Sequence, residues 1–235
     1  MPNSIEILST RPVGEEMKRE ANEQNILIDE ISFISTEEVI GTTTRQRIYE
    51  LSKQEVTVVF TSVNAVKAVS NYVSGKTLWH IYCIGYTTRE LVENTFSKEN
   101  ISGTAENSAQ LAKTIIDGGP AKEIVFFCGD IRRNELPVKL KDAGIEVEEL
   151  IVYKTISTPQ KVAKGYDGIL FFSPSAVDSF FSTNRITDQT KIFAIGTTTG
   201  EAAMTHTQNP IIVSEIPAKK NLINLMIEHF RIKNF

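Results

Sequence analysis

Residues 56–91, VTVVFTSVNAVKAVSNYVSGKTLWHIYCIGYTTREL, decide the fold because a related stretch occurs later in the chain. Residues 167–202, DGILFFSPSAVDSFFSTNRITDQTKIFAIGTTTGEA, align with them without a gap at a constant offset of 111, and ten of the 36 aligned positions are identical. Chance would give roughly two identities, although any two strand–helix–strand segments share some likeness. We therefore predict an internal structural repeat.

The identities gather where a predicted strand passes into a predicted helix. Both copies run from an apolar strand through a turn of small hydroxyl residues into a helix, and then through a second strand and a second such turn. The pattern extends on both sides, with predicted strands at Ile5–Leu8, Ile26–Ile31, Val56–Phe60, Trp79–Ile84, Ile124–Phe127, Ile145–Val152, Gly168–Phe172, Lys191–Ile195 and Pro210–Val213. Predicted helices between them include Val63–Tyr72, Thr87–Phe96, Ser108–Ile116, Arg133–Ala143, Ser175–Phe181 and Leu222–Phe230.

Apolar strands separated by helices are typical of parallel sheets covered on both faces, so the predicted class is α/β. A second, weaker similarity relates the strand–turn–helix–strand pattern of residues 5–31 to that of residues 124–150. Matching the two sets in order gives one sheet with strands near residues 5, 26, 168, 192 and 211, and another with strands near residues 124, 145, 56, 80 and 100. Each would be flavodoxin-like, with the second domain inserted in the first and circularly permuted relative to it.

This arrangement predicts the domain limits. The first domain is discontinuous and comprises residues 1–35 plus 158–235, and the inserted second domain comprises residues 38–152. The chain crosses between them at residues 33–37 and 153–160, which we expect to lie side by side as a two-stranded linker. Double linkers permit opening and closing while limiting free tumbling.

Ligands of open α/β sheets bind beyond the carboxyl ends of the strands, where helix N-termini point. Free backbone N–H groups there, flanked by arginines, favour a carboxylate or phosphate ligand, which we expect to be large enough to touch both domains. Each hydroxyl residue could instead simply cap its helix, and this alternative stays open. The candidate ligand contacts are Arg11, Thr61, Ser62, Asn64, Thr87, Thr88, Arg132, Arg133, Ser173, Pro174, Ser175, Thr197, Thr198 and Thr199.

Composition excludes several classes of protein. The 235 residues carry a net charge of −4, without the basic surplus of a duplex-DNA binder. The longest apolar run, Ile124–Cys128, is far shorter than the roughly 20 residues of a membrane span, and no secretory signal opens the chain. Cys83 and Cys128 form no disulfide or zinc pattern and are predicted to be core residues. We expect a soluble, cytoplasmic protein with no nucleic-acid or membrane partner.

Common catalytic motifs are missing from the sequence. It contains no GxGxxG, GxxxxGK[ST] or GxSxG motif, and no acidic pair follows the first strand of either unit. His80, His206 and His229 have no evident carboxylate partner, so we predict solvated or core histidines. No metal site is expected.

Several short motifs resemble those of the uroporphyrinogen-III synthase family, in the same order along the chain. They are TRP at 10–12, TSVNAV at 61–66, IGYTT at 84–88, CGDIRRNELPVKLKDAG at 128–144, VY at 152–153, FFSPSAV at 171–177 and AIGTTT at 194–199. Gly200 and Ala203 depart from the alanine and leucine that are more usual in the family, which puts the packing of that helix in doubt.

The resemblance implies a lyase of heme biosynthesis that cyclises the linear tetrapyrrole polycarboxylate hydroxymethylbilane to uroporphyrinogen III. Water is lost, ring D is inverted through a spiro intermediate, and no cofactor takes part. The resemblance makes Tyr153 the candidate catalytic acid, with simple packing at a strand end as the alternative. Gly85, Gly129 and Gly196 would allow tight turns and close backbone approach in the substrate-binding site. A monomer that receives its substrate from hydroxymethylbilane synthase is expected.

Two other functions stay open. A non-catalytic two-domain binding module for an anionic metabolite would share the hinge and the helix N-termini, although no segment resembling a signal peptide or a helix-turn-helix supports it. A phosphosugar-handling enzyme should carry a catalytic Asp, Glu or His at a strand end, and none stands out in the sequence.

Overall fold

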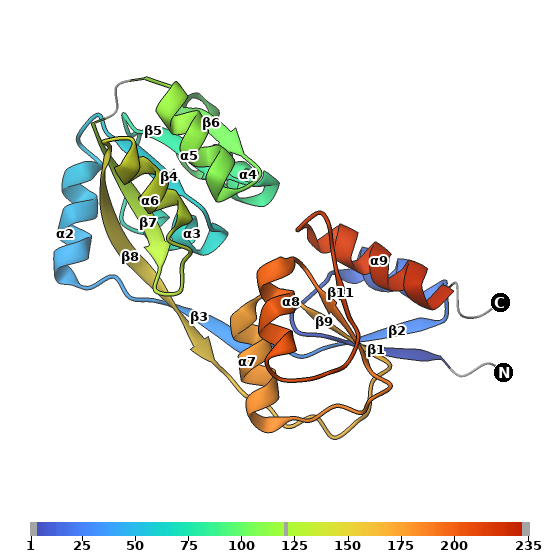
Figure 1. The fold of residues 1–235 in the computed structure, drawn as a ribbon. Helices are drawn as coiled ribbons and strands as arrows, with labels where there is room; N and C mark the ends of the chain where they lie inside the picture. Colours follow the sequence, from blue (N-terminus) through green and yellow to red (C-terminus); the bar gives the residue numbers. More distant parts are fainter. Residues whose placement is uncertain (1–3, 120–121, 232–235) are drawn as a thin grey trace. The chain divides into compact units, whose positions relative to one another are not determined.

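A computed structural model describes residues 4–119 and 122–231 (Figure 1). The chain divides into two compact units. Unit 1 comprises Met1–Ser35 together with Ile156–Phe235, and unit 2 is the intervening segment Thr36–Thr155. Unit 2 is therefore an insertion, and the chain passes between the units twice. Over the described ranges, no helix is long and apolar enough to cross a membrane.

Unit 1 is built on a parallel sheet of five strands: β1 (Ile5–Ser9), β2 (Ile26–Glu30), β9 (Gly168–Phe171), β10 (Lys191–Ala194) and β11 (Ile211–Val213). Their spatial order is β11-β10-β9-β1-β2. The helices of this unit are α1 (Glu15–Asn22), α7 (Pro174–Thr183), α8 (Thr197–Met204) and α9 (Lys219–Arg231).

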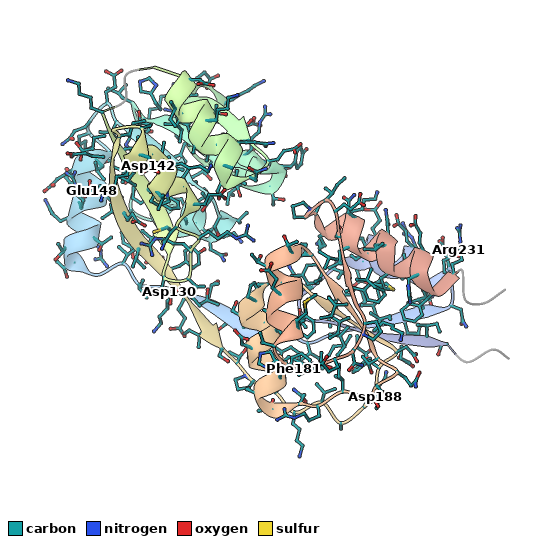
Figure 2. The ribbon with its side chains drawn as sticks, viewed as in Figure 1. Asp130, Asp142, Glu148, Phe181, Asp188 and Arg231 are labelled. Carbon is teal, nitrogen blue, oxygen red and sulfur yellow. The ribbon has the colours of Figure 1, made fainter. Side chains whose placement is uncertain are left out.

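Different helices cover the two faces of this sheet. Successive side chains of a strand point to opposite faces, so Ile7 packs with residues of α1 and α9, while Leu8 packs with residues of α7 and α8. Phe181 of α7, labelled in Figure 2, belongs to this packing. Its ring stacks on that of Phe171 of β9, with the ring centroids 6.0 Å apart. Both faces of the sheet are thus buried, which explains why β9, β10 and β11 are nearly continuous apolar runs.

Unit 2 has a six-stranded sheet with the order β3-β8-β7-β4-β5-β6. These strands are β3 (Ile34–Glu38), β4 (Thr57–Phe60), β5 (His80–Ile84), β6 (Ile101–Ala105), β7 (Glu123–Gly129) and β8 (Glu146–Ser157). One face packs against α2 (Thr42–Leu51), α3 (Val63–Ser70) and α4 (Tyr86–Phe96), and the other against α5 (Ser108–Asp117) and α6 (Glu135–Asp142). A short 3₁₀ turn, η1 (Lys98–Asn100), precedes β6.

The predicted fold class is confirmed. When the strands of unit 1 are numbered along the chain, their spatial order is 2-1-3-4-5, which is flavodoxin-like. Unit 2 shows the same order when β7 is taken as its first strand, followed by β8, β4, β5 and β6. Its strands are therefore circularly permuted relative to those of unit 1, and the predicted strand near residue 100 is β6.

Some elements differ from the sequence prediction. The crossing predicted at residues 33–37 is strand β3, and β8 runs to Ser157, into the second predicted crossing. The two strands are neighbours in the sheet, so the connection between the units is itself a ladder of paired strands. Helix α2 was not predicted because only Ile48 and Leu51 on it are buried, which leaves too few apolar residues for a helical period.

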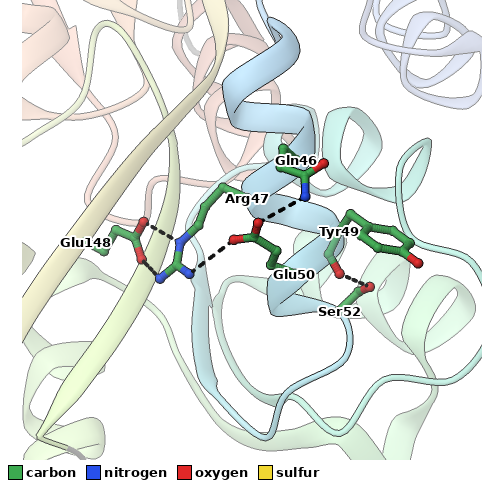
Figure 3. Close-up of polar contacts among 6 residues, drawn as sticks. All are labelled: Gln46, Arg47, Tyr49, Glu50, Ser52 and Glu148. Carbon is green, nitrogen blue, oxygen red and sulfur yellow. Dashed lines mark hydrogen bonds and ion pairs between the residues drawn. The ribbon is translucent and has the colours of Figure 1, made fainter.

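An ion pair compensates for the small apolar face of α2 (Figure 3). The Arg47 guanidinium donates from Nε to Glu148 Oε1 at 2.9 Å and from Nη2 to Glu148 Oε2 at 2.7 Å. Glu148 lies on β8, so this bidentate contact ties α2 to the sheet, and both side chains are partly buried. Bidentate arginine–carboxylate pairs with fixed geometry contribute more to stability than ordinary surface ion pairs.

We predict that Glu148→Gln lowers the free energy of unfolding by about 1 kcal/mol, since one charge-assisted pair is lost. Urea unfolding at low salt measures the change. Glu50→Gln is the matched control, because Glu50 lies farther from the same guanidinium, at 3.9 Å, and is more exposed. Equal losses for the two variants would contradict a special role for the bidentate pair.

A second polar cluster holds the segment before β9 against the sheet of unit 1. Lys164 Nζ contacts Asp29 Oδ2 at 2.8 Å and Glu6 Oε2 at 2.7 Å, and the Tyr166 hydroxyl donates to Asp29 Oδ2 at 2.9 Å. The hydrogen bond from Lys164 holds the pKa of Asp29 below its usual value, against the effect of partial burial. The ionised form of Asp29 is therefore favoured in the folded state.

The pKa of Asp29 is lower in the folded than in the unfolded chain, so the ionised carboxylate stabilises the folded state. This stabilisation is fully present at pH values above the unfolded pKa, and it is lost as the pH falls through the folded pKa. We predict that Asp29→Asn unfolds at lower urea than the parent at pH 7, and that this difference shrinks by about pH 3. Asp188→Asn, at an exposed position of unit 1, is the control. A difference in unfolding between Asp29→Asn and the parent that does not change with pH would contradict a stabilising role for the Asp29 charge.

Candidate functional site

The carboxyl ends of the parallel strands of unit 2 lie at one edge of its sheet, which we call the carboxyl edge of unit 2. The turns there are residues 61–62 after β4, 85–87 after β5 and 129–131 after β7. Since β7, β4 and β5 are neighbours spaced roughly 4.8 Å apart, these turns form one row. The sequence-predicted residues of unit 2 are thus brought to a common edge.

The turn after β4 begins helix α3. Ser62 is the N-cap residue, with extended backbone, and its Oγ accepts a hydrogen bond from the Asn64 backbone N–H at 3.1 Å. The capping role left open by the sequence therefore applies to Ser62. The Thr61 hydroxyl has no hydrogen-bond partner among the described residues, so it is available to a ligand.

The turn after β5 begins helix α4 at Gly85, whose φ of 76° is the left-handed conformation that favours glycine. Thr87 is exposed, whereas Thr88 is only 6% exposed and lies in the core. Direct contact of the Thr88 side chain with a ligand, which the sequence predicted, does not fit this burial. Tyr86, which the sequence reasoning passed over, is 81% exposed at the same turn.

Unit 1 repeats this arrangement at its own carboxyl edge, formed by residues 9–11, 172–175 and 195–198. Ser173 caps α7 by accepting from the Ala176 backbone N–H at 3.2 Å, and its Oγ lies 3.1 Å from that of Ser175. Pro174 occupies the first turn of α7, where its missing N–H costs nothing. The capping role therefore applies here too.

The turn after β10 places three threonines in the first turn of α8, after Gly196, whose backbone is extended. Thr197 is exposed and Thr198 is half-buried, but Thr199 is only 2% exposed. Thr199 thus matches Thr88 of unit 2, and its predicted contact with a ligand does not fit either. The equivalent positions of the repeat are buried in both units.

The three predicted arginines have different environments. Arg11 is exposed, with its guanidinium 5.4 Å from the centre of the Phe172 ring. Arg133 is exposed in the turn before α6. Arg132 forms an ion pair with Glu149 of β8, so it can bind an anion only if that pair breaks. Arg11, which is exposed, remains the better candidate for contact with an anionic ligand.

Tyr153 of β8 lies at the carboxyl edge of unit 2, opposite Gly129 of β7, where the register of the two strands shifts. A Cβ atom at Gly129 would lie 2.6 Å from Tyr153 Cζ and 2.8 Å from its hydroxyl oxygen. Only glycine therefore allows the ring to lie against the backbone of β7. The predicted close approach at Gly129 thus has a specific partner, Tyr153.

Burial raises the pKa of the half-buried Tyr153, while hydrogen bonding from the Ser62 side chain partly lowers it. The phenol is consequently protonated at neutral pH. A protonated hydroxyl beside a helix N-terminus can donate a proton to a leaving group or a hydrogen bond to an anion. The geometry therefore agrees with a weak acid at this position.

Two histidines do have carboxylate partners, contrary to the sequence expectation. His80 Nε2 lies 3.0 Å from Glu55 Oε1, and His206 Nε2 lies 2.8 Å from Asp178 Oδ1. The partners are 25 and 28 residues away along the chain, so no local sequence pattern indicates these pairs. All four side chains are largely or partly exposed, as expected of solvated surface pairs.

Cys83 and Cys128 are buried and unpaired, as predicted, and burial raises the pKa of each thiol to about 11. They are therefore inert, small core residues. In the described part of the chain, no three His, Cys, Asp or Glu side chains gather as metal ligands would.

A cavity of about 1090 Å³ lies at the opposite, amino-terminal edge of the unit 2 sheet. It is lined by residues that begin β4, β5 and β7, including Thr57, His80 and Glu123. Ser102 Oγ lies there 3.4 Å from His80 Nδ1. None of the predicted site residues lines this cavity, and ligands of parallel sheets bind at the carboxyl edge.

Comparison with known proteins supplies the family context. A family model described as "Uroporphyrinogen-III synthase HemD" matches residues 15–224. The uroporphyrinogen-III synthase of Saccharomyces cerevisiae is 26% identical over 175 residues, which cover 61% of this chain and 62% of the yeast protein. This chain thus matches less than two thirds of that relative's length.

Solved structures support the fold. A mutant uroporphyrinogen III synthase from Thermus thermophilus superposes with a TM-score of 0.61 at 14% identity, covering 99% of this chain and 100% of that one. Uroporphyrinogen-III synthetase from Helicobacter pylori gives a TM-score of 0.65 at 12% identity, covering 96% and 99%. At these identities, the similarity establishes the architecture alone.

The contact between Gly129 and Tyr153 yields a prediction. Gly129→Ala should lower the free energy of unfolding by about 1–3 kcal/mol, because the new methyl group displaces the Tyr153 ring. Most of this loss should vanish when the same change is made in a Tyr153→Ala background. Urea unfolding of the parent, the two single variants and the double variant measures both effects.

Gly165→Ala is the control for the loss of backbone flexibility, since a Cβ there meets no atom within 4 Å. A Gly129→Ala loss that persists without the Tyr153 ring would show that the glycine serves the backbone rather than the tyrosine.

Proposed function

Because the chain belongs to the uroporphyrinogen-III synthase family, we propose that it cyclises hydroxymethylbilane to uroporphyrinogen III. The observation that carries this proposal is the family match over residues 15–224, which includes the turns of both carboxyl edges except residues 9–11 after β1. In this reaction the terminal hydroxyl leaves as water, ring D is inverted through a spiro intermediate, and the macrocycle closes.

This reaction requires little acid–base catalysis from the protein. The C–O bond breaks as the hydroxyl takes up one proton and leaves as water, the nitrogen of the same pyrrole ring gives up its proton, and the azafulvene that results is a strong electrophile. A weak acid such as the Tyr153 phenol, kept protonated by burial, is adequate for this step. Orientation of the reacting ends can supply roughly 7–11 kcal/mol of the barrier reduction in favourable cases.

We propose that the carboxylates of the substrate bind at the turns of the two units. Helix N-termini at Ser62, Gly85, Ser173 and Gly196 present backbone N–H groups with partial positive charge. The exposed hydroxyls of Thr87 and Thr197 and the guanidinium groups of Arg11 and Arg133 add donors at the same turns. We assign these residues to substrate binding.

The remaining features of the proposal follow from the family resemblance. The enzyme would act without a cofactor, as a monomer in the cytoplasm, on a substrate handed over from hydroxymethylbilane synthase. The composition agrees with a cytoplasmic location, since its two cysteines are both buried in the core and unpaired.

The test is a coupled assay in which freshly generated hydroxymethylbilane is supplied and the products are oxidised and separated as porphyrin isomers. The spontaneous reaction gives isomer I, so each assay contains its own background. We expect isomer III to dominate. Isomer I alone, from folded protein that binds a polycarboxylate, would instead indicate a non-catalytic binding module.

We predict that Tyr153→Phe lowers kcat for isomer III by about 10- to 100-fold without abolishing it, because orientation by the rest of the site persists. Tyr49→Phe is the control, since Tyr49 is exposed on α2, outside the carboxyl edge. An unchanged rate would assign Tyr153 to packing, whereas a rate equal to that without enzyme would make it indispensable.

A further inference from the structure

Tyr153 lies near the end of a long strand and needs a fixed orientation to donate a proton productively. β8 runs to Ser157, and the chain leaves unit 2 after Thr155, two residues beyond Tyr153. On one side β8 pairs with β3, but on the other side its pairing with β7 ends at Gly129, opposite Tyr153, so this side of the strand needs a further restraint. The contacts around Asp130, which directly follows β7, supply that restraint.

Asp130 makes two contacts with β8, both immediately C-terminal to the Tyr153 side chain. Its backbone N–H donates to the Tyr153 carbonyl at 3.1 Å, and its Oδ1 accepts from the Thr155 backbone N–H at 2.9 Å. The same Oδ1 accepts from the Ile131 N–H at 2.8 Å, which fixes the carboxylate in its own turn. Figure 2 labels Asp130 at this end of β7 and β8.

The strand register explains why a side chain is needed here. The pairing of β7 and β8 shifts between Cys128 and Gly129, so the regular ladder is disturbed beside Tyr153. Bulges of this kind redirect side chains and commonly occur next to functional sites. Beyond the shift, the Asp130 carboxylate takes over a strand N–H, that of Thr155, which would otherwise be left to solvent.

We propose that Asp130 is the positioning residue of the site: it holds the end of β8 against the turn after β7 and so fixes the Tyr153 hydroxyl beside the N-terminus of α3. Gly129 provides the space for the ring, and Asp130 provides the restraint. The consequence for the reaction rests on the proposed function, whereas the restraint on Tyr153 itself does not.

Electrostatics give the proposal a second readout. The negative charge of Asp130 adds to the effect of burial in raising the pKa of Tyr153, while Ser62 opposes it. Asp130→Ala removes both the charge and the acceptor, and Asp130→Asn removes the charge but keeps an oxygen that can accept from Thr155. Both variants should lower the pKa of Tyr153, with Asp130→Ala lowering it more because the ring also becomes less enclosed.

The experiment combines NMR with kinetics. The titration of Tyr153 is followed in protein labelled at tyrosine Cζ, with its resonance assigned by Tyr153→Phe. Asp142→Ala, at an exposed position on α6, is the matched control and should leave the titration unchanged. An unaltered Tyr153 titration in both Asp130 variants would overturn the proposal, irrespective of whether the protein makes uroporphyrinogen III.

In the isomer assay, Asp130→Ala should lower kcat about 10-fold with little change in KM, and Asp130→Asn should lose less. Adding Asp130→Ala to Tyr153→Phe should cause no further loss, because the residue acts through the tyrosine. Independent, multiplicative losses would overturn the proposal. If Asp130→Ala fails to fold, Asp130→Asn alone and combined with Tyr153→Phe provides the same test of the proposal. Failure of the parent protein to form isomer III would refute the proposed function and leave the NMR result to judge the restraint.

Discussion

Parallel pairing between strands that are distant in the chain is the constraint on which both units depend. In unit 1, β1 pairs with β9, although unit 2 lies between them in the sequence. Side chains reinforce this pairing: the Asp167 carboxylate accepts from the Glu6 backbone N–H at 2.8 Å, and the Thr10 hydroxyl donates to the Leu170 carbonyl at 2.8 Å. Parallel pairing requires crossover helices, and these bury both faces of each sheet.

The same constraint leaves the edges of the sheets as the place for chemistry. Every strand of a parallel sheet ends on one side, so the turns that follow them and the helix N-termini are neighbours by construction. In each unit one hydroxyl residue of these turns serves as a helix cap, Ser62 in unit 2 and Ser173 in unit 1, whereas α4 and α8 begin at glycines without a side-chain cap. Ligand binding by the remaining N–H groups and threonines then requires no dedicated catalytic framework, in keeping with a reaction governed largely by orientation.

The repeat in the sequence was sufficient to predict the topology, since it marks equivalent strands and turns in the two units. Part of that identity reflects packing rather than function: Thr88 and Thr199 are buried equivalents, and so are Ala65 and Ala176. A hydroxyl residue next to a predicted turn therefore could not be assigned to ligand contact or core from sequence alone. Burial depends on which face of the helix turns toward the sheet.

Other features depend on contacts that no local pattern encodes. β3 has only one residue that is not fully exposed, and it is a strand because it pairs with β8. Arg132 resembled a free anion-binding group until the structure paired it with Glu149, 17 residues away. Likewise, Ile131, 64% exposed after β7, and Tyr86 after β5 are apolar residues at the carboxyl edge. Both lie within a few residues of the end of a predicted strand, and this position was the signal that could have identified them.

The insertion of unit 2 also has a consequence for synthesis on the ribosome. β1 and β2 emerge first, but β9, the inner neighbour of β1, follows only after the whole of unit 2. At roughly 5–20 residues per second, this delay is on the order of 10 s, during which Ile7 and Leu8 lack those of their packing partners that lie on β9, β10, α7 and α9. Unit 2, by contrast, is contiguous and can complete its sheet as soon as it emerges. The nascent chain can therefore complete the sheet of unit 2 before β9, β10 and β11 are available to complete that of unit 1.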